Sequence, residues 1–475
     1  MQEVKEIQTV DYERVLSDFL KKHPQYSESG FLDELRKKDF SRIEAKDHVY
    51  LDFVGGNLYP ASLIQDHQDF LLADVYGNPH SENPTSKLAT ECNEKARAYV
   101  KEYFNDKEDE YCVVFTLNAS GALKLIGEAY PFTDKSHYAL LVDNHNSVNG
   151  IREFARCKQS KFTYVPVLED SLTIDEKKLD TVLNDDKGYD NKLFAYPAQS
   201  NFSGVKHDLK WIGEAQERGW DVLLDAAAYA PSNELDLSKY KPEFVSISFY
   251  KIFGYPTGIG ALLIRKSVLH KMKRPWFAGG TIELASVRGD GHFFADNEVG
   301  FEDGTINYLN IPAVEMGLKY IKNIGIENIQ KRITSLAQWT LDELLPLKHD
   351  NGTSLIELYG TSDLSKRGAT ITFNVKSSDG KVIFYEEIES NANKLGISLR
   401  AGCFCNPGLS EIVGQFTPEM LRPVFECEEK TSYKKFVHAK KEEFVVGAIR
   451  ASFGYVSNFK DAYTLVNYIK SYLNK

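Results

Sequence analysis

Residues 248–264 read Ser248-Phe249-Tyr250-Lys251-Ile252-Phe253-Gly254-Tyr255-Pro256-Thr257-Gly258-Ile259-Gly260-Ala261-Leu262-Leu263-Ile264. A β-type run from Phe244 to Ser248 precedes the lysine, and a glycine-rich turn then leads into a second apolar run. This pattern places Lys251 at the end of a strand. A lysine there can be desolvated and lose its proton more easily than a surface lysine, as chemistry on a carbonyl group requires. From this stretch alone a solvated loop lysine is the simpler interpretation, and residues elsewhere in the chain change that.

Apolar strands and amphipathic helices alternate along the chain before this stretch. Four further strands are predicted, and each ends close to a polar residue. They run from Cys112 to Leu117 before Ser120, from Tyr138 to Asp143 before His145, from Leu193 to Tyr196 before Asn201, and from Val222 to Leu224 before Asp225. The alternation predicts an α/β fold with a mostly parallel sheet covered by helices, in which ligands bind at the carboxyl ends of the strands.

The chain of 475 residues is long enough for two hydrophobic cores. Residues 1–48 are polar with apolar positions spaced for one buried helix face, which predicts an N-terminal helical arm packed on the body. Residues 49–315 form the predicted large domain. Helices and then β segments follow, and they predict a smaller α+β domain over residues 316–475. The polar run from Glu426 to Lys441 is predicted to be a solvated loop or insertion.

Composition narrows the classes of partner. The formal net charge is −11 and no basic block interrupts the chain, which argues against a nucleic-acid partner. The first residues lack the profile of a signal peptide and no window is apolar enough to span a bilayer, so we expect a cytoplasmic protein with a small-molecule substrate and no membrane contact. The six cysteines are not spaced as a disulfide framework, and reduced thiols are expected.

The polar residues at the strand ends form a set that pyridoxal 5'-phosphate requires. Its phosphate needs a helix N-terminus and hydroxyl groups, its ring nitrogen a carboxylate, its aldehyde a lysine and its ring an aromatic face. Each residue alone has an ordinary explanation: His145 as a core histidine, Asp225 as a helix cap and Ser120 as a turn residue. Their occurrence on successive strands favours a site for this cofactor. The set comprises Ser120, His145, Asn201, Asp225, Ser248 and Lys251.

Further motifs extend this pattern along the chain. They are Tyr50-Leu51-Asp52, Tyr76-Gly77-Asn78-Pro79-His80-Ser81, Asp225-Ala226-Ala227, Phe301-Glu302-Asp303-Gly304-Thr305 and Leu399-Arg400-Ala401-Gly402-Cys403-Phe404-Cys405-Asn406-Pro407-Gly408. From about residue 48 onward, the chain resembles the class V aminotransferases of fold type I, in particular the cysteine desulfurase group. Within that group it is most similar to the amino-terminal domain of the eukaryotic molybdenum-cofactor sulfurases. The resemblance implies a large domain that binds the cofactor and a smaller C-terminal domain.

The resemblance also implies a role for each matching residue. Lys251 matches the lysine that binds the cofactor covalently, and Asp225 matches the partner of the ring nitrogen. His145 matches the residue that stacks on the ring, and Asn201 the asparagine at the ring hydroxyl. Further cofactor-binding positions are Ala119, Ser120, Ser248 and Tyr250; Gly304 and Thr305 match a loop that reaches the phosphate of the neighbouring subunit; Arg450 and Arg400 match substrate-binding arginines. A homodimer with shared sites is therefore expected.

Cys405 aligns with the family's persulfide-forming cysteine. A loop with glycine and proline after Arg400 can expose this thiol. The implied reaction converts L-cysteine to L-alanine and leaves the sulfur on Cys405 for an acceptor protein or cofactor. Cys403 is a rival, and a purely structural pair is an alternative. A metal site is ranked low because no second cysteine pair has ligand spacing, so no metal is expected.

Two positions depart from many cysteine desulfurases. Ala228 stands where they have glutamine, and Tyr250 stands where they have histidine. Both residues fit the sulfurase pattern and argue against a housekeeping iron–sulfur role. The molybdenum-cofactor-binding domain of the eukaryotic sulfurases is not expected here, so cofactor sulfuration would need a separate partner. The alternatives are another class V reaction without a persulfide step, such as C–S lyase, transaminase or epimerase chemistry, and a non-catalytic scaffold.

Overall fold

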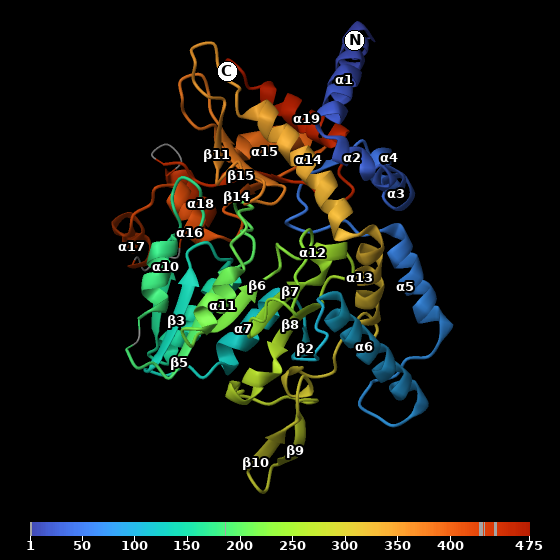
Figure 1. The fold of residues 1–475 in the computed structure, drawn as a ribbon, viewed down its shortest axis with the longest axis vertical. Helices are drawn as coiled ribbons and strands as arrows, with labels where there is room; N and C mark the ends of the chain where they lie inside the picture. The colour runs from blue at the N-terminus through green and yellow to red at the C-terminus, as the bar shows by residue number, and fades with distance from the viewer. Residues whose placement is uncertain (1, 186, 427–430, 432, 441–443) are drawn as a thin grey trace.

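A seven-stranded sheet forms the centre of the molecule (Figure 1). The computed structural model describes residues 2–185, 187–426, 431, 433–440 and 444–475. The strand order is β2-β8-β7-β6-β5-β3-β4, and β8 runs antiparallel to both of its neighbours while the other pairs are parallel. The predicted mostly parallel sheet is confirmed. Its strands are β2 (Tyr111–Thr116), β3 (Ser136–Leu141), β4 (Lys161–Val165), β5 (Asn191–Pro197), β6 (Asp221–Asp225), β7 (Phe244–Ser248) and β8 (Gly260–Arg265).

Both faces of this sheet are buried, which explains why its strands are continuous apolar runs. Successive residues of β8 alternate between two hydrophobic clusters: Ala261 and Leu263 belong to the larger, and Leu262 and Ile264 to the smaller. Helices α7 (Ala119–Ala129) and α9 (Ile151–Cys157) cover the face of the smaller cluster. The other face packs against α6 (Pro84–Tyr103), α10 (Glu176–Leu183) and α11 (Lys210–Gln216).

A second, antiparallel sheet of four strands lies above the first in Figure 1. Its order is β11-β12-β15-β14, and it is accompanied by helices that include α14 and α19. The chain passes from one sheet to the other through α13 (Pro312–Ile324) and α14 (Ile326–Leu344). The domain limits at residues 315 and 316 stay a prediction. The other elements here are β11 (Ile356–Tyr359), β12 (Thr370–Val375), α15 (Tyr385–Lys394), β14 (Arg400–Gly402), α16 (Pro407–Val413), β15 (Ala448–Ser452) and α19 (Phe459–Lys470).

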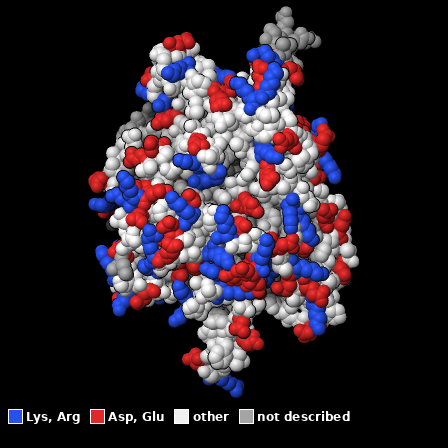
Figure 2. All heavy atoms as spheres, viewed as in Figure 1, with Lys and Arg blue, Asp and Glu red and all other residues white. Residues whose placement is uncertain are grey.

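Smaller elements complete the architecture. The two-residue strand β1 (Val49–Tyr50) pairs with β13 (Ile397–Ser398), and α5 (Ala61–Ala73) packs against α13. A hairpin of β9 (Ile282–Ser286) and β10 (Gly291–Phe294) projects from the body in Figure 1. Positive and negative side chains are interspersed on the face drawn in Figure 2. No helix in the described part of the chain is both long and apolar enough to cross a membrane.

Two local predictions are corrected. Lys251 was expected to lead directly into a turn, but it lies within the short helix α12 (Phe249–Phe253). Gly254, in a left-handed conformation, ends this helix. The polar run from Glu426 to Lys441 contains a helix, α18 (Tyr433–Lys440), where a loop was predicted, and α17 (Pro418–Glu426) leads into it. Residues 427–430, 432 and 441 of this run lie outside the described residues.

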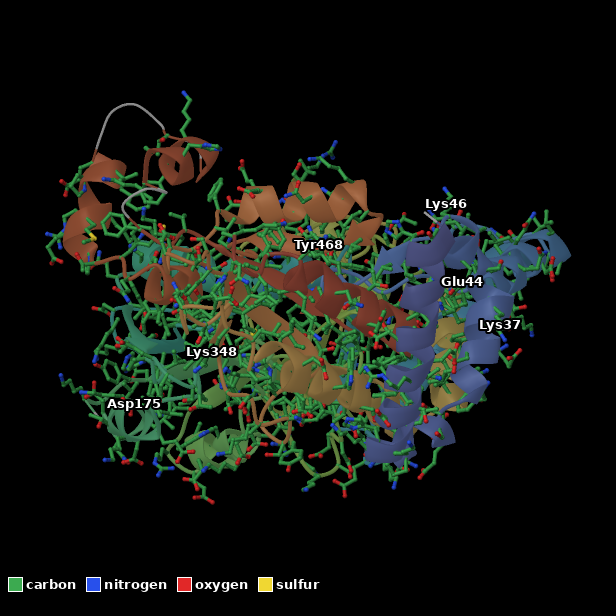
Figure 3. All side chains as sticks on the ribbon, turned by 90° about the horizontal axis from the view of Figure 1, so that it is seen from above. Lys37, Glu44, Lys46, Asp175, Lys348 and Tyr468 are labelled. Atoms are coloured by element: carbon green, nitrogen blue, oxygen red, sulfur yellow. The ribbon has the colours of Figure 1, made fainter. Side chains whose placement is uncertain are left out.

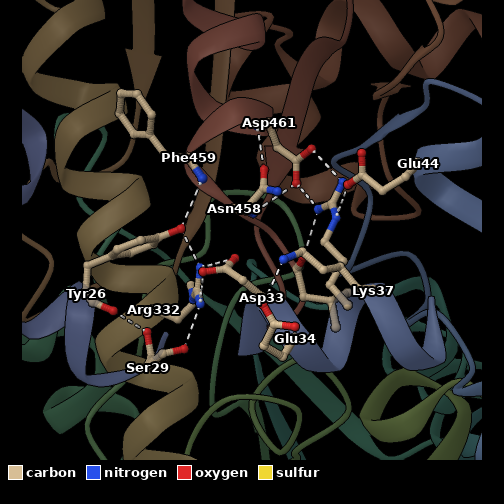
Figure 4. Close-up of polar contacts among 12 residues, drawn as sticks. Tyr26, Ser29, Asp33, Glu34, Lys37, Glu44, Arg332, Asn458, Phe459 and Asp461 are labelled. Atoms are coloured by element: carbon tan, nitrogen blue, oxygen red, sulfur yellow. Dashed lines mark hydrogen bonds and ion pairs between the residues drawn. The ribbon is translucent and has the colours of Figure 1, made fainter. Parts of the chain in front are cut away.

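Four N-terminal helices lie along one side of the molecule. Seen from above in Figure 3, the helices that carry Lys37 and Glu44 lie at the opposite end from Asp175. Their contacts with the C-terminal part are made largely by α14 and α19 (Figure 4). The helices are α1 (Gln2–Lys22), α2 (Pro24–Glu28), α3 (Phe31–Asp39) and α4 (Ser41–Ala45).

Two buried arginines fasten this arm. Arg36 on α3 donates to both carboxylate oxygens of Asp461 at 2.5 and 3.2 Å, and to the carbonyl of Val456 at 2.8 Å. Arg332 on α14 donates to Asp33 at 2.9 Å and to the Ser29 carbonyl at 2.7 Å. Because Asp461 is only 1% exposed, its charge depends on Arg36 for compensation.

Replacing Arg36 by methionine tests this fastening. The Arg36→Met variant leaves the buried Asp461 carboxylate without its cation and should destabilise the fold by about 3 kcal/mol. Arg14→Met, which removes an exposed ion pair with Asp11 on α1, is the matched control and should leave the stability almost unchanged. Urea unfolding midpoints measure both effects, and equal shifts in the two variants would contradict this assignment.

Candidate functional site

A cavity of about 360 Å³ opens at the carboxyl ends of the parallel strands. Its size lies within the range of small-molecule sites. It brings together eight of the residues singled out from the sequence, and they come from the carboxyl ends of β6 and β7 and from the segments that follow β2, β3, β5 and β7. They are Ala119, Ser120, His145, Asn201, Asp225, Ser248, Tyr250 and Lys251. Cys405, Gly304, Thr305, Arg400 and Arg450 do not line this cavity.

The N-terminus of α7 forms one end of the cavity. Asn118 caps the helix by accepting from the amide of Gly121 at 2.9 Å, while the amides of Ala119 and Ser120 have no acceptor within the helix. The Ser120 hydroxyl lies 2.6 Å from that of Ser147, which follows β3. Free amides, two hydroxyl groups and the positive end of the helix dipole together suit a phosphate group.

A glycine in β8 allows this turn to come so close to the sheet. A Cβ atom on Gly260 would lie 2.5 Å from the backbone carbonyl carbon of Asn118 and 2.8 Å from the nitrogen of Ala119. Both contacts are with backbone, so they could be relieved only by moving the start of α7. The helix N-terminus is therefore positioned by the absence of a side chain in the neighbouring strand.

Asp225 ends β6 and is fixed on one side by hydrogen bonds. Its Oδ1 accepts from the Ser246 hydroxyl at 2.9 Å and from the amide of Ala227 at 3.0 Å. Ser246 is the residue directly opposite Asp225 on β7. This arrangement orients a buried carboxylate in the cavity wall, where it can accept from a protonated ring nitrogen.

Lys251 is half-buried on α12 and lines the same cavity. Burial lowers the pKa of its amine, and the nearby Asp225 carboxylate partly opposes this shift. The neutral, nucleophilic form of Lys251 is therefore more populated near neutral pH than that of a surface lysine. The reactive role of Lys251 stays a prediction.

His145 caps the short helix α8 (Asn146–Asn149) with its ring. The Nδ1 atom accepts from the amide of Ser147 at 3.1 Å, which places the proton of the neutral ring on Nε2. Burial lowers the pKa of His145, and the Lys251 amine adds to this effect while Asp225 opposes it. A neutral imidazole in the cavity wall provides the aromatic face expected there.

The two predicted substrate arginines meet at one carboxylate outside the cavity. Asp52 lies between them, accepting from Arg450 at 3.0 Å through Oδ1 and from Arg400 Nε at 3.0 Å through Oδ2. Arg450 is 3% exposed, and it also donates to the backbone oxygen of Asn201 at 2.6 Å. Burial lowers the pKa of Arg450, whereas Asp52 opposes the shift. Its Nε atom is buried without a hydrogen-bond partner.

The cysteine loop connects β14 to α16. Cys405 is exposed and Cys403 is partly buried, and neither forms a disulfide. Phe404 and Cys405 both adopt left-handed backbone conformations with φ near +54° and +55°. The Cys405 carbonyl accepts from the amide of Asn146 at 2.8 Å, next to the cavity residue His145. No cluster of three or more potential metal ligands occurs among the residues that the structure describes.

Gly304 and Thr305 lie on the loop after the short 3₁₀ helix η2 (Val299–Phe301), and they do not line the cavity of their own chain. The adjacent Glu302 anchors the loop: its Oε1 accepts from the Phe115 amide at 2.7 Å and from Arg97 at 2.8 Å. Burial raises the pKa of Glu302, while the Arg97 guanidinium acts in the opposite direction. The motif thus combines a buried residue, Glu302, with an exposed one, Thr305.

Sequence reasoning missed several residues of the site. Gln199, Thr257 and Gly258 line the cavity but were assigned no role. Thr257 and Gly258 stand within the quoted lysine stretch, and Gln199 follows β5, so strand-end position was an available signal. Asp52 was noted only as part of a motif. Its pairing with Arg450 joins residues 398 positions apart, and no local pattern encodes that contact.

The family model for aminotransferase class-V matches residues 49–465. The chain belongs to this family. The match begins at the end of the N-terminal helical arm and includes both sheets, so the cavity and the cysteine loop lie within it.

Curated relatives include molybdenum cofactor sulfurases. The protein of Solanum lycopersicum is 38% identical over 93% of this chain and 57% of its own length. The human protein is 35% identical over 93% of this chain and 51% of its own length. The chain therefore spans little more than half the length of these relatives.

Solved structures support the same fold. A cysteine desulfurase from Thermococcus onnurineus has a TM-score of 0.75 at 22% identity, covering 92% of this chain and 97% of its own. The cysteine desulfurase CsdA of Escherichia coli has a TM-score of 0.73 at 20% identity, covering 93% and 98%. The predicted α/β fold of the type I class is confirmed.

A substitution at Gly260 tests the phosphate-binding end of the cavity. Gly260→Ala should displace the start of α7, destabilise the fold by about 1–3 kcal/mol and raise the half-saturating phosphate concentration about tenfold. Gly213→Ala on α11, where an added Cβ meets nothing within 4 Å, is the matched control. Melting temperatures across a phosphate titration measure both quantities. An unchanged phosphate response in Gly260→Ala would refute the role of this helix end.

Proposed function

We propose that the cavity binds pyridoxal 5'-phosphate and that the protein is a cysteine desulfurase-like enzyme. The family to which the chain belongs uses this cofactor. The observation that carries the proposal is the convergence of a lysine of lowered pKa, a buried carboxylate and a free helix N-terminus in one cavity. Each matches a different chemical group of the cofactor, so a chance arrangement of all three is a poor explanation.

The residues present fit the cofactor. The amides of Ala119 and Ser120 would hold the phosphate, with hydroxyl groups such as that of Ser248 beside them. Asp225 would accept from the ring nitrogen, and His145 would cover one face of the ring. When bound, the cofactor supplies an electron sink for the α-carbon of an amino acid.

Lys251 would have two tasks in such a site. Its Nζ atom would bind the aldehyde carbon, and as a free amine it would accept the α-proton of the substrate. Both tasks require the neutral form, which burial of Lys251 favours. The nearby Asp225 carboxylate keeps the pKa of Lys251 from falling further, so the amine can still hold a proton after accepting it.

The rate at which the protein without cofactor captures pyridoxal 5'-phosphate should depend on the protonation of Lys251. Because its pKa is lowered, the rate should rise with pH and reach half of its maximum below about pH 10.4, the ordinary lysine value. Below that midpoint the amine is protonated and the rate should fall about tenfold per pH unit. Stopped-flow absorbance measures the profile, with Nα-acetyl-lysine, whose only free amine is the side chain, as reference, and coincidence of the two midpoints would contradict the assignment.

L-cysteine is the substrate that the cysteine loop supports best. Arg450 and Arg400 would bind its carboxylate in exchange for contacts that they now make with Asp52. The Cys405 thiolate would attack the substrate sulfur: an S–S bond forms, the C–S bond breaks, and the carbon keeps the electron pair and takes a proton. The products are L-alanine and a persulfide on Cys405. Similarity to molybdenum cofactor sulfurases favours the molybdenum cofactor as the sulfur acceptor.

We further propose a homodimer that completes the site. Thr305 is exposed and Gly304 is half-buried, and the neighbouring β9–β10 hairpin exposes apolar side chains including Leu284, Val287 and Phe293. The amide of Gly304 donates to the carbonyl of Gly279 at the base of this region, so loop and hairpin form one surface. Exposed apolar groups of this kind mark association surfaces. A second copy would bring Thr305 to the phosphate of its partner.

Substitution of the two loop cysteines tests the reaction. With bound cofactor and L-cysteine, Cys405→Ser should form neither alanine nor protein persulfide, because only this exposed thiol is assigned the attack on sulfur. Cys403→Ser is the matched control, two residues away, and should keep both products. Amino-acid analysis and persulfide labelling measure the outcome. Alanine formation that is indifferent to both substitutions would favour a class V reaction without a persulfide step.

A further inference from the structure

Four hydrogen bonds between the body and the cysteine loop lead from the cavity to Cys405. The side-chain Nδ2 of Asn201 donates to the Phe404 carbonyl at 2.6 Å, and the amide of Asn146 donates to the Cys405 carbonyl at 2.8 Å. The third and fourth come from Asn406, whose Nδ2 donates to Asp143 at 2.6 Å and to Asn201 Oδ1 at 3.1 Å. The left-handed conformations of Phe404 and Cys405 are thus held by groups outside the loop.

Asn406 has a double role. Its Oδ1 accepts from the Leu409 amide at 3.2 Å and so caps α16, while its Nδ2 donates to Asp143 and, at 3.1 Å, to Asn201 Oδ1. Asn406 is fully buried, so the cost of losing either partner is not relieved by water.

Asp143 holds Asn406 in place by accepting from its Nδ2 atom. It is fully buried at the end of β3 and accepts from Ser200 at 2.8 Å, while its other oxygen lies 3.0 Å from His207 Nε2. A carboxylate held by these neighbours presents a fixed acceptor to Asn406. The loop therefore rests on a rigid part of the large sheet rather than on its own domain alone.

Asn201 links the loop to the cavity. It lines the cavity, and its side chain both donates to Phe404 and accepts from Asn406. An amide nitrogen carries two N–H groups, so one can hold the loop while the other serves a ligand oxygen. A change in the contact with the loop must alter how the Asn201 amide is oriented toward a ligand in the cavity, and the reverse also holds.

We propose that Asn406, anchored by Asp143, is a positioning residue that docks the Cys405 loop, and that Asn201 couples this docking to cofactor binding. The inference rests on the proposed cofactor but not on the desulfurase reaction. Coupling between two sites is reciprocal, so a docked loop strengthens cofactor binding and bound cofactor holds the loop more firmly. Cofactor binding then increases the fraction of molecules in which the loop that carries the thiol is docked.

The variant Asn406→Ser isolates this contact. Serine still caps α16 but lacks the Nδ2 donor. Asn458→Ser is the matched control. Asn458 caps α19 in the same way, accepting from the Asp461 amide at 3.1 Å, and it does not line the cavity. Melting temperatures of both variants show whether a loss of cap strength alone explains an effect.

Two measurements without L-cysteine test the proposal. Titration with pyridoxal 5'-phosphate should show a dissociation constant raised about fivefold or more in Asn406→Ser and changed less than about twofold in Asn458→Ser. Hydrogen exchange of residues 400–408 should slow when the native chain binds the cofactor, and should be faster in Asn406→Ser. Equal affinities in the two variants, or loop exchange indifferent to the cofactor, would overturn it.

These readouts are separate from the proposed reaction. A native chain that binds the cofactor and shows the coupling, but forms no alanine from L-cysteine, would overturn the desulfurase assignment and support the coupling. A native chain that does not bind pyridoxal 5'-phosphate would overturn both, and the absorbance of the native protein reveals this before any variant is made.

Discussion

The parallel pairing of β6 with β7 is the contact on which the site depends. It sets Asp225 opposite Ser246, whose hydroxyl fixes the carboxylate at 2.9 Å, and it brings Lys251, three residues beyond the end of β7, to the same edge of the sheet. A shift of one residue would turn Asp225 to the other face and separate the carboxylate from the lysine. The field of Asp225 also reaches Lys251 and His145, so this register influences the pKa values of both.

Long-range polar contacts determine where the smaller sheet sits relative to that edge. Asp52, Arg450 and the Asn201 backbone join the N-terminal segment, β15 and the turn after β5. Asp143 and Asn406 join β3 to the cysteine loop in a similar way. Because these groups are buried, each contact is expensive to leave unmade, and together they fix the distance between the arginines, the thiol and the cavity.

The sheet and most residues that line the cavity could be predicted from the sequence, and for identifiable reasons. Strands such as β5 and β7 are buried on both faces, so they are continuous apolar runs, and the polar residues that follow these parallel strands mark the binding edge. Helix α12 was missed because five residues between a strand and a glycine carry too little periodicity. The Asp52–Arg450 pair and the shared role of Asn201 depend on tertiary contacts that have no local signature. Cys405 and Gly304 were predicted for a site whose cavity they do not line, and their roles stay predictions.

The central claim is that Lys251 is the residue to which pyridoxal 5'-phosphate binds covalently. The most direct measurement is borohydride reduction of the cofactor-loaded protein, followed by peptide mass spectrometry. The account predicts that the cofactor mass is found on the peptide containing Lys251 and is lost from that peptide in Lys251→Ala. A label on another lysine, or no label on a folded protein that has been incubated with the cofactor, would contradict it.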